Sequence, residues 1–241
     1  MRTSNAFQVV FQSAEFIVVN KPSGLLSIPD RFGKEASVKS ILEEQYGKGN
    51  VFTVHRIDRD TSGLLVFAFD AEVHKQLNTL FETRAVVKKY VTLVLGTPPT
   101  PQGSITTGIA EHPVNKGTMQ VHAAGKPSHT EYAVQKTYKQ YSFIECEIHT
   151  GRTHQIRVHM QHLGCPVVCD ELYGDGKPVL VSNLKKKFNL SKLQEEERPI
   201  LNRLALHANY LAFTLQEQEY SFTAPLFKDM QATLQQLDKH G

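Results

Sequence analysis

The sequence contains no tryptophan and only three cysteines among its 241 residues. Because Cys146, Cys165 and Cys169 are too few and too closely spaced for a disulfide framework, they favour a reducing compartment. Long apolar runs are also missing: the longest, residues 64–69, is far shorter than the ~20 residues of a membrane-spanning helix. The N-terminus has no apolar stretch of the kind found in signal peptides. We therefore expect a cytoplasmic protein without a membrane partner.

An excess of one charge is likewise missing, since 27 Lys and Arg residues stand against 24 Asp and Glu residues. A net charge of only +3 neither requires nor excludes a nucleic-acid partner. The positive charge is concentrated in residues 177–203, which contain seven basic and three acidic side chains and leave 20 basic and 21 acidic ones elsewhere. With Pro178 and Pro199, this segment indicates a basic insertion or loop. Two interpretations stay open, a solvated surface and an arm that contacts phosphate groups.

The predicted elements are those of an α+β fold. Apolar patterns predict strands at residues 16–20, 64–69, 87–95, 130–138, 141–148, 204–215 and 220–223, and helices at 37–46, 70–81, 151–163 and after Pro225. Because hairpins are more evident than βαβ units, we expect a largely antiparallel mixed sheet flanked by helices. No linker interrupts the chain, so residues 1–241 are predicted to form a single domain.

Common catalytic motifs are missing as well. The sequence has no G-x-G-x-x-G, no G-x-x-x-x-G-K-[ST] and no G-x-S-x-G, which argues against dehydrogenases, P-loop NTPases and α/β-hydrolases. The segment His55-Arg56-Ile57-Asp58 is similar to the catalytic loop of protein kinases, but there the Asp directly follows the Arg. The kinase Gly-rich loop and D-F-G motif are also missing, so we exclude a kinase.

Metal-binding residue types crowd one region, residues 149–169, but their spacing is wrong for a metal site. The group comprises His149, His154, His159, His162, Cys165 and Cys169. His154 and His159 are five residues apart and so do not share a helical face, and there is no H-E-x-x-H motif. We expect packing and hydrogen-bonding roles here, with His159 and His207 as structural hydrogen-bonding residues. The sequence predicts neither a metal nor another cofactor.

Two polar clusters are more specific. In the first, an apolar strand at residues 51–54 leads into a polar turn that carries Asp58, and the buried strand 64–69 follows. Asp58 should therefore lie in a loop held by two core strands, a rigid position for a reacting group. The residues alone leave open whether Asp58 is a catalyst or forms a structural ion pair with an arginine.

The second cluster spans residues 149–159, His-Thr-Gly-Arg-Thr-His-Gln-Ile-Arg-Val-His. It is polar where a helix is predicted to begin, so its side chains and free N–H groups can meet an anion or the edge of a base. Arg152 lies in the predicted first turn, from which it can pair with a carboxylate elsewhere in the chain.

Taken in order, these motifs resemble those of the RluA-type pseudouridine synthases. The matching segments are Val18–Leu26, His55–Asp58 with Thr61–Gly63, Lys89-Tyr90, Gly151–His159, the pair Asp170 and Tyr173, Leu206–Ala208 and Phe222–Pro225. They cover the chain from about residue 14 to about residue 225. The resemblance implies the pseudouridine synthase fold and a cofactor-free reaction. In that reaction the N-glycosidic bond of a uridine in RNA breaks, and the ribose is rejoined to C5 of the same base.

The resemblance also implies roles for individual residues. Asp58 would be the essential aspartate, adding to the anomeric carbon, stabilising it, or removing a proton beside it. Arg152 would pair with Asp58 and keep it ionised. Tyr90 would stack on the uracil and use its hydroxyl to move a proton.

Further residues are implicated in RNA binding. A base inside a stack must be extruded before it can react, and Arg56 matches the position whose side chain the family inserts into the vacated space. His55, Lys21 and Arg157 are additional candidates for contacts with RNA. Lys21 and Arg157 also have structural alternatives, a solvated turn and a salt bridge on a helix face respectively.

The resemblance narrows the partner to RNA. Many relatives carry an N-terminal S4 domain, whereas only about 14 residues precede the motifs here, as in the RluA branch proper. Members of that branch modify large-subunit ribosomal RNA, a tRNA anticodon stem-loop, or both. We expect a monomer without an obligatory protein partner. The competing hypothesis is an RNA-binding or RNA-folding protein without catalysis, which would have no use for the set of Asp58, Tyr90 and Arg152.

Overall fold

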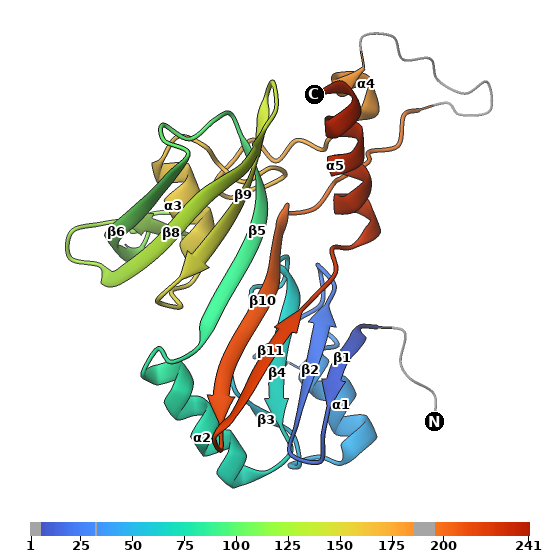
Figure 1. Cartoon of the computed structure of the whole chain (residues 1–241), viewed down its shortest axis with the longest axis vertical. Coiled ribbons are helices and arrows are strands. Elements are labelled where there is room, and N and C mark those ends of the chain that lie inside the picture. Colours follow the sequence, from blue (N-terminus) through green and yellow to red (C-terminus); the bar gives the residue numbers. More distant parts are fainter. Residues whose placement is uncertain (1–5, 32, 186–195) are drawn as a thin grey trace. The chain divides into compact units, whose positions relative to one another are not determined.

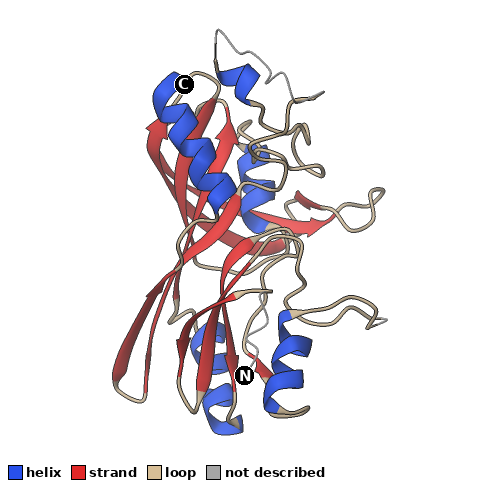
Figure 2. Ribbon diagram, turned by 90° about the vertical axis from the view of Figure 1, so that its right-hand side faces the viewer, coloured by secondary structure: helices blue, strands red, loops and turns tan. Residues whose placement is uncertain are grey.

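The computed structural model describes residues 6–31, 33–185 and 196–241. They form two compact units (Figure 1). Unit 1 comprises the described residues of Met1–Tyr90 and His207–Pro225, and unit 2 those of Val91–Leu206 and Leu226–Gly241. The chain therefore passes from one unit to the other inside two strands and again after Pro225. Strands, drawn in red in Figure 2, make up most of the regular structure.

Unit 1 is built on a mixed sheet with two helices. Its elements are β1 (Gln8–Gln12), β2 (Phe16–Lys21), α1 (Val38–Tyr46), β3 (Phe52–Thr53), β4 (Ser62–Ala68), α2 (Ala71–Glu82), β10 (Leu206–Leu215) and β11 (Gln218–Thr223). The strand order is β1-β2-β4-β10, with β3 on β4 and β11 on β10. The β4–β10 pair is parallel, whereas β1–β2, β2–β4, β3–β4 and β10–β11 are antiparallel.

Strands β2 and β4 are buried along their whole length, as the apolar run at residues 64–69 predicts. Successive side chains of a strand point to opposite faces of its sheet. On one face, Val66 belongs to a cluster that contains Leu77 of α2. On the other, Phe67 belongs to a cluster that contains Leu42 of α1. Because apolar clusters cover both faces, β4 is apolar at every position from Leu64 to Ala68.

Helices α1 and α2 begin where the sequence predicts. Ser37 Oγ accepts a 3.0 Å hydrogen bond from the Ser40 N–H, and Ser40 Oγ accepts a 2.9 Å bond from the Ser37 N–H, which makes a capping box. Asp70 Oδ1 accepts from the N–H groups of Glu72 (2.9 Å) and Val73 (3.0 Å). These side chains satisfy N–H groups that the first turn of a helix leaves without a partner.

Strands β4 and β10 approach each other closely at the Thr61–Gly63 motif. Gly63 has φ +118°, and a Cβ at this position would overlap the backbone of Ala208, so the close approach requires glycine. Beside it, Ser62 Oγ and His207 Nδ1 are 2.9 Å apart, and His207 Nε2 lies 3.3 Å from the carbonyl oxygen of Ala224. His207 is fully buried, and its predicted role as a structural hydrogen-bonding residue is confirmed.

Unit 2 contains strands in the order β5-β9-β8-β6-β7. Its elements are β5 (Val87–Leu95), β6 (Gln102–Glu111), β7 (Met119–Val121), β8 (Lys126–Thr137), β9 (Tyr141–Ile148), α3 (Gln155–His162), α4 (Val181–Leu184) and α5 (Lys228–His240). The pairs β6–β7, β6–β8 and β8–β9 are antiparallel. The β8–β9 pair is the predicted hairpin, although β8 begins at Lys126 instead of residue 130. The predicted α+β fold with a largely antiparallel mixed sheet is confirmed.

Three strands, β1, β6 and β7, are not predicted by the sequence patterns. Of the ten residues of β6, only Ile105 and Ile109 are buried. Its remaining positions are mostly small or polar, so the apolar alternation that reveals a strand is weak. Strand β7 is too short, at three residues, to produce any periodicity.

Helix α3 begins later than predicted, at Gln155 instead of residue 151. Residues 151–154 form a turn that ends with His154 in the left-handed region, at φ 55°. The Gln155 side chain stabilises this turn, since Oε1 accepts from the Thr150 hydroxyl (2.7 Å) and from the Arg152 N–H (3.0 Å). Arg152 therefore lies in a turn that precedes the helix. Hydrogen bonds to the Gln155 side chain stabilise this turn where a first helical turn was expected.

Only the two ends of the basic segment 177–203 are described, because residues 186–195 lie outside the described residues. An antiparallel bridge between Val179 and Leu201 joins the two ends. In it the Val179 N–H donates a 2.7 Å hydrogen bond to the carbonyl oxygen of Leu201. The short helix α4 follows Val179. The undescribed residues include Lys186, Lys187 and Lys192. Contact of this segment with phosphate groups therefore stays a prediction.

The helices are short. The longest of those described, α5, has 13 residues. Within residues 6–31, 33–185 and 196–241, no helix combines the length and the apolar character needed to cross a bilayer.

Candidate active site

Asp58 lies in the loop between β3 and β4, as predicted, and hydrogen bonds anchor the loop on both sides of it. Before Asp58, the carbonyl oxygen of the buried Ile57 accepts a 2.7 Å hydrogen bond from Ser27 Oγ. After Asp58, the carbonyl oxygen of Arg59 accepts a 2.8 Å bond from Lys21 Nζ. The backbone that carries this carboxylate is therefore held in place, which suits a group that must keep one orientation during a reaction.

Lys21 supports this loop from inside the protein. Its side chain is fully buried, and Nζ donates to the carbonyl oxygens of Pro22 (3.0 Å), Leu25 (2.7 Å) and Arg59 (2.8 Å). An ammonium group has three protons, and these bonds employ all three. These contacts favour support of the Asp58 loop by Lys21, and its direct contact with RNA stays a prediction.

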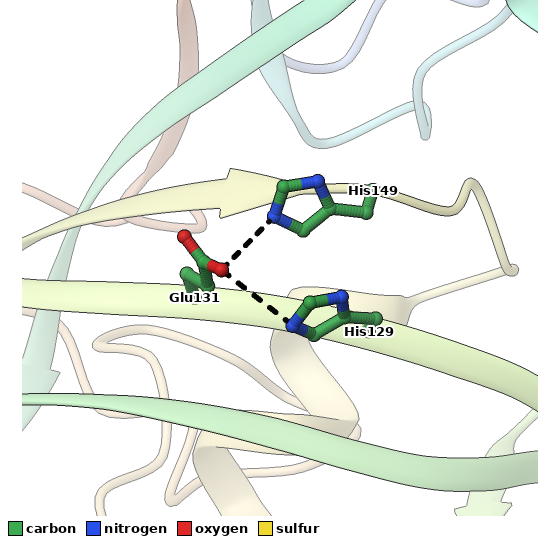
Figure 3. A group of neighbouring side chains, drawn as sticks. All are labelled: His129, Glu131 and His149. Atoms are coloured by element: carbon green, nitrogen blue, oxygen red, sulfur yellow. Dashed lines mark ion pairs between the residues drawn. The ribbon is translucent and has the colours of Figure 1, made fainter.

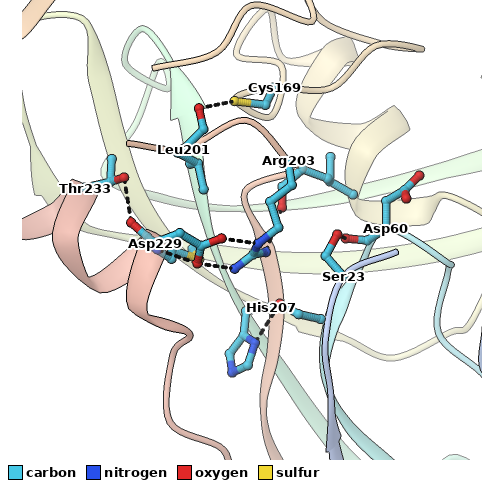
Figure 4. A network of polar contacts seen from close by, with 11 residues as sticks. Ser23, Asp60, Cys169, Leu201, Arg203, His207, Asp229 and Thr233 are labelled. Atoms are coloured by element: carbon cyan, nitrogen blue, oxygen red, sulfur yellow. Dashed lines mark hydrogen bonds and ion pairs between the residues drawn. The ribbon is translucent and has the colours of Figure 1, made fainter. Parts of the chain in front are cut away.

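Further contacts join the N-terminal motif to the Asp58 loop. Ser23 Oγ donates a 2.7 Å hydrogen bond to the carbonyl oxygen of Asp60, next to which Ser23 lies in Figure 4. The N–H of Gly24 donates to the carbonyl oxygen of Arg59 at 3.0 Å, and Arg59 Nε donates back to the carbonyl oxygen of Gly24 at 3.1 Å. Two motifs that are far apart in the sequence therefore form one supporting structure.

The charge of Asp58 affects the pKa of Tyr90. Burial raises the pKa of the Tyr90 hydroxyl, and the negative charge of Asp58 raises it further. The phenol therefore stays protonated at neutral pH. In this state its hydroxyl can donate a hydrogen bond or a proton but does not act as a phenolate base.

His55 is neutral and packed. Its Nε2 accepts a 3.2 Å hydrogen bond from the Val66 N–H, and its ring stacks on Phe81 with centroids 4.6 Å apart. Burial, with a smaller contribution from the positive charge of Lys88, lowers the pKa of His55 to about 3. A neutral imidazole tied to the backbone offers no positive charge to a phosphate. The geometry thus favours a positioning role for His55 over the expected direct contact with RNA.

Arg56 differs from both of its neighbours because it is exposed, whereas His55 is half-buried and Ile57 is buried. The backbone is consequently anchored on either side while the guanidinium group is presented to solvent. This arrangement suits a side chain that has to enter another molecule.

Arg152 belongs to unit 2 and lies in the turn before α3. Its N–H donates to Gln155 Oε1, and its Nε donates a 3.0 Å hydrogen bond to the carbonyl oxygen of Pro127 in β8. The side chain is half-buried. Gln155 itself is buried and anchored by its Nε2 to the carbonyl oxygen of His129 (2.9 Å) and to Thr130 Oγ1 (2.9 Å).

Arg157 is a structural residue. It is buried, and its Nε and Nη2 donate to the two carboxylate oxygens of Asp170, each at 2.7 Å. Its guanidinium group also lies over the ring of Tyr173, 4.9 Å from the centroid. A buried bidentate pair with a carboxylate leaves no charge facing solvent, which disfavours contact of Arg157 with RNA; that contact stays a prediction. The alternative of a salt bridge is confirmed, and it explains the spacing of the Asp170 and Tyr173 motif.

Two of the histidines at residues 149–169, His154 and His159, take part in hydrogen bonds. His159 is fully buried, with Nε2 2.9 Å from Ser128 Oγ and Nδ1 2.9 Å from Thr130 Oγ1. Burial and the neighbouring histidines lower its pKa to about 4. His154 Nδ1 is 2.7 Å from the Tyr173 hydroxyl. These contacts confirm the hydrogen-bonding role predicted for His159.

Two supporting residues were missed by sequence reasoning. Ser27 holds the backbone of Ile57, and Gln155 holds the turn that contains Arg152. Gln155 lies inside the motif at residues 151–159, so the sequence singled out its position but did not indicate its supporting role. Ser27 is an ordinary serine after an apolar pair, and only its neighbours in space reveal its function.

Comparison with known proteins shows the family of the chain. The family model described as RNA pseudouridylate synthase matches residues 15–162. The chain is 33% identical over 232 residues to the ribosomal large subunit pseudouridine synthase D of Buchnera aphidicola subsp. Acyrthosiphon pisum, covering 94% of this chain and 72% of that protein. It is 35% identical over 226 residues to an RNA pseudouridine synthase of Chloroflexus aurantiacus, covering 90% of this chain and 65% of that one.

Solved structures show the same fold. Human RNA pseudouridylate synthase domain containing 4 superposes with a TM-score of 0.74 and 26% identity, covering 96% of this chain and 93% of that chain. Human RNA pseudouridylate synthase domain containing 1 superposes with a TM-score of 0.72 and 24% identity, covering 96% and 90%.

The α+β fold and the matching motifs define the class of the protein, an enzyme that isomerises a nucleotide within RNA. The chain belongs to the RNA pseudouridylate synthase family, whose members convert uridine to pseudouridine. The resemblance to RluA-type synthases is confirmed. Family membership favours this isomerase over the competing hypothesis of an RNA-binding protein without catalysis.

Proposed function

We propose that this isomerase acts on a uridine in large-subunit ribosomal RNA and that Asp58 is its essential carboxylate. The observation that carries the assignment is the anchored loop: Ser27 and Lys21 hold the backbone on both sides of Asp58 through hydrogen bonds. The choice of RNA rests on the relatives, several of which are named ribosomal large subunit pseudouridine synthase D. A tRNA anticodon stem-loop is the alternative substrate.

The chemistry needs a carboxylate but no redox partner. The N1–C1′ bond of the uridine breaks, the uracil turns, C5 bonds to C1′, the proton on C5 is lost and N1 gains a proton. Charge that develops at C1′ is stabilised by a negative group placed beside it, as in glycoside hydrolysis. Asp58 acts either by adding to the sugar or by removing a proton next to C1′, and both routes require its ionised form.

Tyr90 and Arg152 complete the catalytic set that we propose. Tyr90 offers an aromatic face for the uracil and a protonated hydroxyl, because burial and Asp58 raise its pKa. Arg152 supplies a positive charge that favours the ionised form of Asp58. The role of Arg152 rests on its place in the matched motif alone.

Arg56 enters the RNA stack when the uridine is extruded, and its exposed side chain supports this assignment. His55 is assigned to hold the backbone for Arg56. We also propose that the two units act as one catalytic domain, that the protein is a cytoplasmic monomer without an obligatory partner, and that the basic residues of segment 177–203 contact the outer part of the RNA.

The test is Asp58→Asn in cells that lack the chromosomal copy, followed by pseudouridine mapping of ribosomal and transfer RNA. Asp60→Asn is the matched control, because it is exposed in the same loop and contributes its backbone carbonyl to Ser23. We expect the wild type and Asp60→Asn to restore the modification in large-subunit RNA and Asp58→Asn to restore none. Full restoration by Asp58→Asn would exclude it as the catalyst, and sites confined to tRNA would replace the proposed substrate.

A further inference from the structure

Three side chains with metal-binding atoms converge on one face of the β8–β9 hairpin: His129, Glu131 and His149 (Figure 3). One ligand atom from each lies within 4.8 Å of the others. Glu131 Oε1 is 3.4 Å from His149 Nε2 and 3.7 Å from His129 Nε2. No second group of three such residues occurs in the part of the chain that the structure describes.

The strand pairing creates this cluster. His129 and Glu131 are two residues apart in β8 and therefore point to the same face. The N–H of His149 donates a 3.1 Å hydrogen bond to the carbonyl oxygen of His129, which places the two histidines side by side across the strands. Their rings stack with centroids 4.4 Å apart. The ligands are thus held on rigid elements, which favours a defined binding geometry.

The Nε2 atom of His149 is the strongest indication that this cluster binds a ligand. Its Nε2 is inaccessible to solvent and makes no hydrogen bond, although 35% of the side chain is exposed. Its contact with Glu131 Oε1, at 3.4 Å, is an ion-pair contact and not a hydrogen bond. Buried polar atoms in proteins are almost always paired, and a metal ion accepts the lone pair of an imidazole nitrogen as effectively as a proton does.

The distances suit an ion of the zinc type. With metal–ligand bonds of ~2.0–2.1 Å, a tetrahedral ion separates neighbouring donor atoms by roughly 3.3 Å. The separations of 3.4 and 3.7 Å from Glu131 are close to this value. His129 Nε2 now contacts Ser104 Oγ at 2.9 Å, so binding an ion requires His129 to exchange this hydrogen bond for the metal.

We propose that His129, Glu131 and His149 bind a divalent transition-metal ion and that Zn²⁺ matches the set best. Two imidazoles and one carboxylate are ligands that zinc accepts, whereas Mg²⁺ and Ca²⁺ require mostly oxygen. Water completes the coordination. Of the histidines and cysteines for which the sequence predicts no metal, only His149 takes part, and it joins residues of a neighbouring strand.

The ion joins two strands at the point where the Arg152 turn begins. The N–H of His129 donates to Thr150 Oγ1 at 3.0 Å, and the Thr150 hydroxyl in turn donates to Gln155, which holds Arg152. A metal bridge between His129 and His149 therefore stabilises the base of this turn. Because an ion that binds only the folded state raises its stability, the melting temperature should rise with zinc concentration.

The test is zinc titration of the metal-free full chain by calorimetry, with the melting temperature as a second reading. We expect one ion per chain at micromolar affinity. His149→Gln and Glu131→Gln should each weaken binding at least ~10-fold, as loss of groups that support a metal does. His162→Gln is the matched control, because His162 is an exposed histidine outside the cluster. Unchanged affinity in both cluster variants, or no saturable binding by the wild type, would overturn the proposal.

A measurement on the unaltered chain covers the case in which the variants do not fold. Diethyl pyrocarbonate modifies neutral imidazoles, and the modified residues are identified by mass spectrometry. Zinc should protect His129 and His149 and leave His122, which is exposed elsewhere, fully reactive. Equal modification of all three with and without zinc contradicts the site.

Discussion

The carboxylate of Asp58 adds to burial in raising the pKa of the Tyr90 hydroxyl. This relationship links the predicted nucleophile or base to the predicted aromatic partner within one unit. It also keeps the Tyr90 hydroxyl protonated at neutral pH, so Tyr90 can donate a proton.

Tyr90→Phe separates stacking from proton donation. The ring is retained while the hydroxyl is lost, so we expect RNA affinity to change little. The rate of isomerisation should fall by about 10²–10⁴, the usual contribution of a positioned acid or base. Single-turnover kinetics with a saturating RNA fragment measure this rate. If Tyr90→Phe retains the wild-type rate and Tyr90→Leu does not, only the aromatic face is required.

Arg56→Ala tests base flipping. Loss of one stacking guanidinium should lower kcat/KM for the cognate RNA by about 10–100-fold, since stacking on a base is worth ~1–3 kcal/mol. Binding of unrelated RNA should change far less. Arg84→Ala, which removes another exposed arginine of unit 1, serves as the control. An equal loss of affinity for every RNA would assign Arg56 to phosphate contact instead.

Lys21→Met distinguishes support of the Asp58 loop from contact with RNA. The substitution leaves three carbonyl oxygens without their donor, and we expect the free energy of unfolding to fall by about 2–4 kcal/mol. Urea unfolding measures this loss. The salt dependence of RNA affinity should keep its slope, because a buried ammonium releases no counterion. A shallower slope with unchanged stability would restore the phosphate contact.

Buried neutral histidines predict acid sensitivity. The pKa of His159 is lowered to about 4 by burial and neighbouring histidines, against about 6.5 in the unfolded chain. The unfolded state therefore binds the proton first, so stability is complete above pH 6.5 and is lost as the pH falls towards 4. One such group contributes up to ~1.4 kcal/mol per pH unit. His159→Gln should flatten the profile of unfolding free energy against pH in this window, whereas His122→Gln, at an exposed site, should not.

Elements with local signals were predicted well. Ser37 and Asp70 cap their helices as expected, because a cap acts on N–H groups two or three residues away. The hairpin of β8 and β9 was evident from the alternation in residues 141–148. The order of the motifs identified the family across most of the chain. Strand β6 and the late start of α3 were not foreseen, because each depends on partners outside the segment itself.

What the sequence by itself determined is therefore most of the elements, the reaction and the position of Asp58 in its loop, since these follow from local periodicity and from ordered motifs. Only the tertiary structure decided the roles of the cations. Lys21 binds a carbonyl oxygen 38 residues away and Arg157 a carboxylate 13 residues away, and these buried contacts favour a supporting role for both over contact with RNA. The cluster of His129, Glu131 and His149 likewise exists only because the register of β8 and β9 brings separate segments to one face. Charge and burial at a residue depend on neighbours in space, and the folded chain alone supplies them.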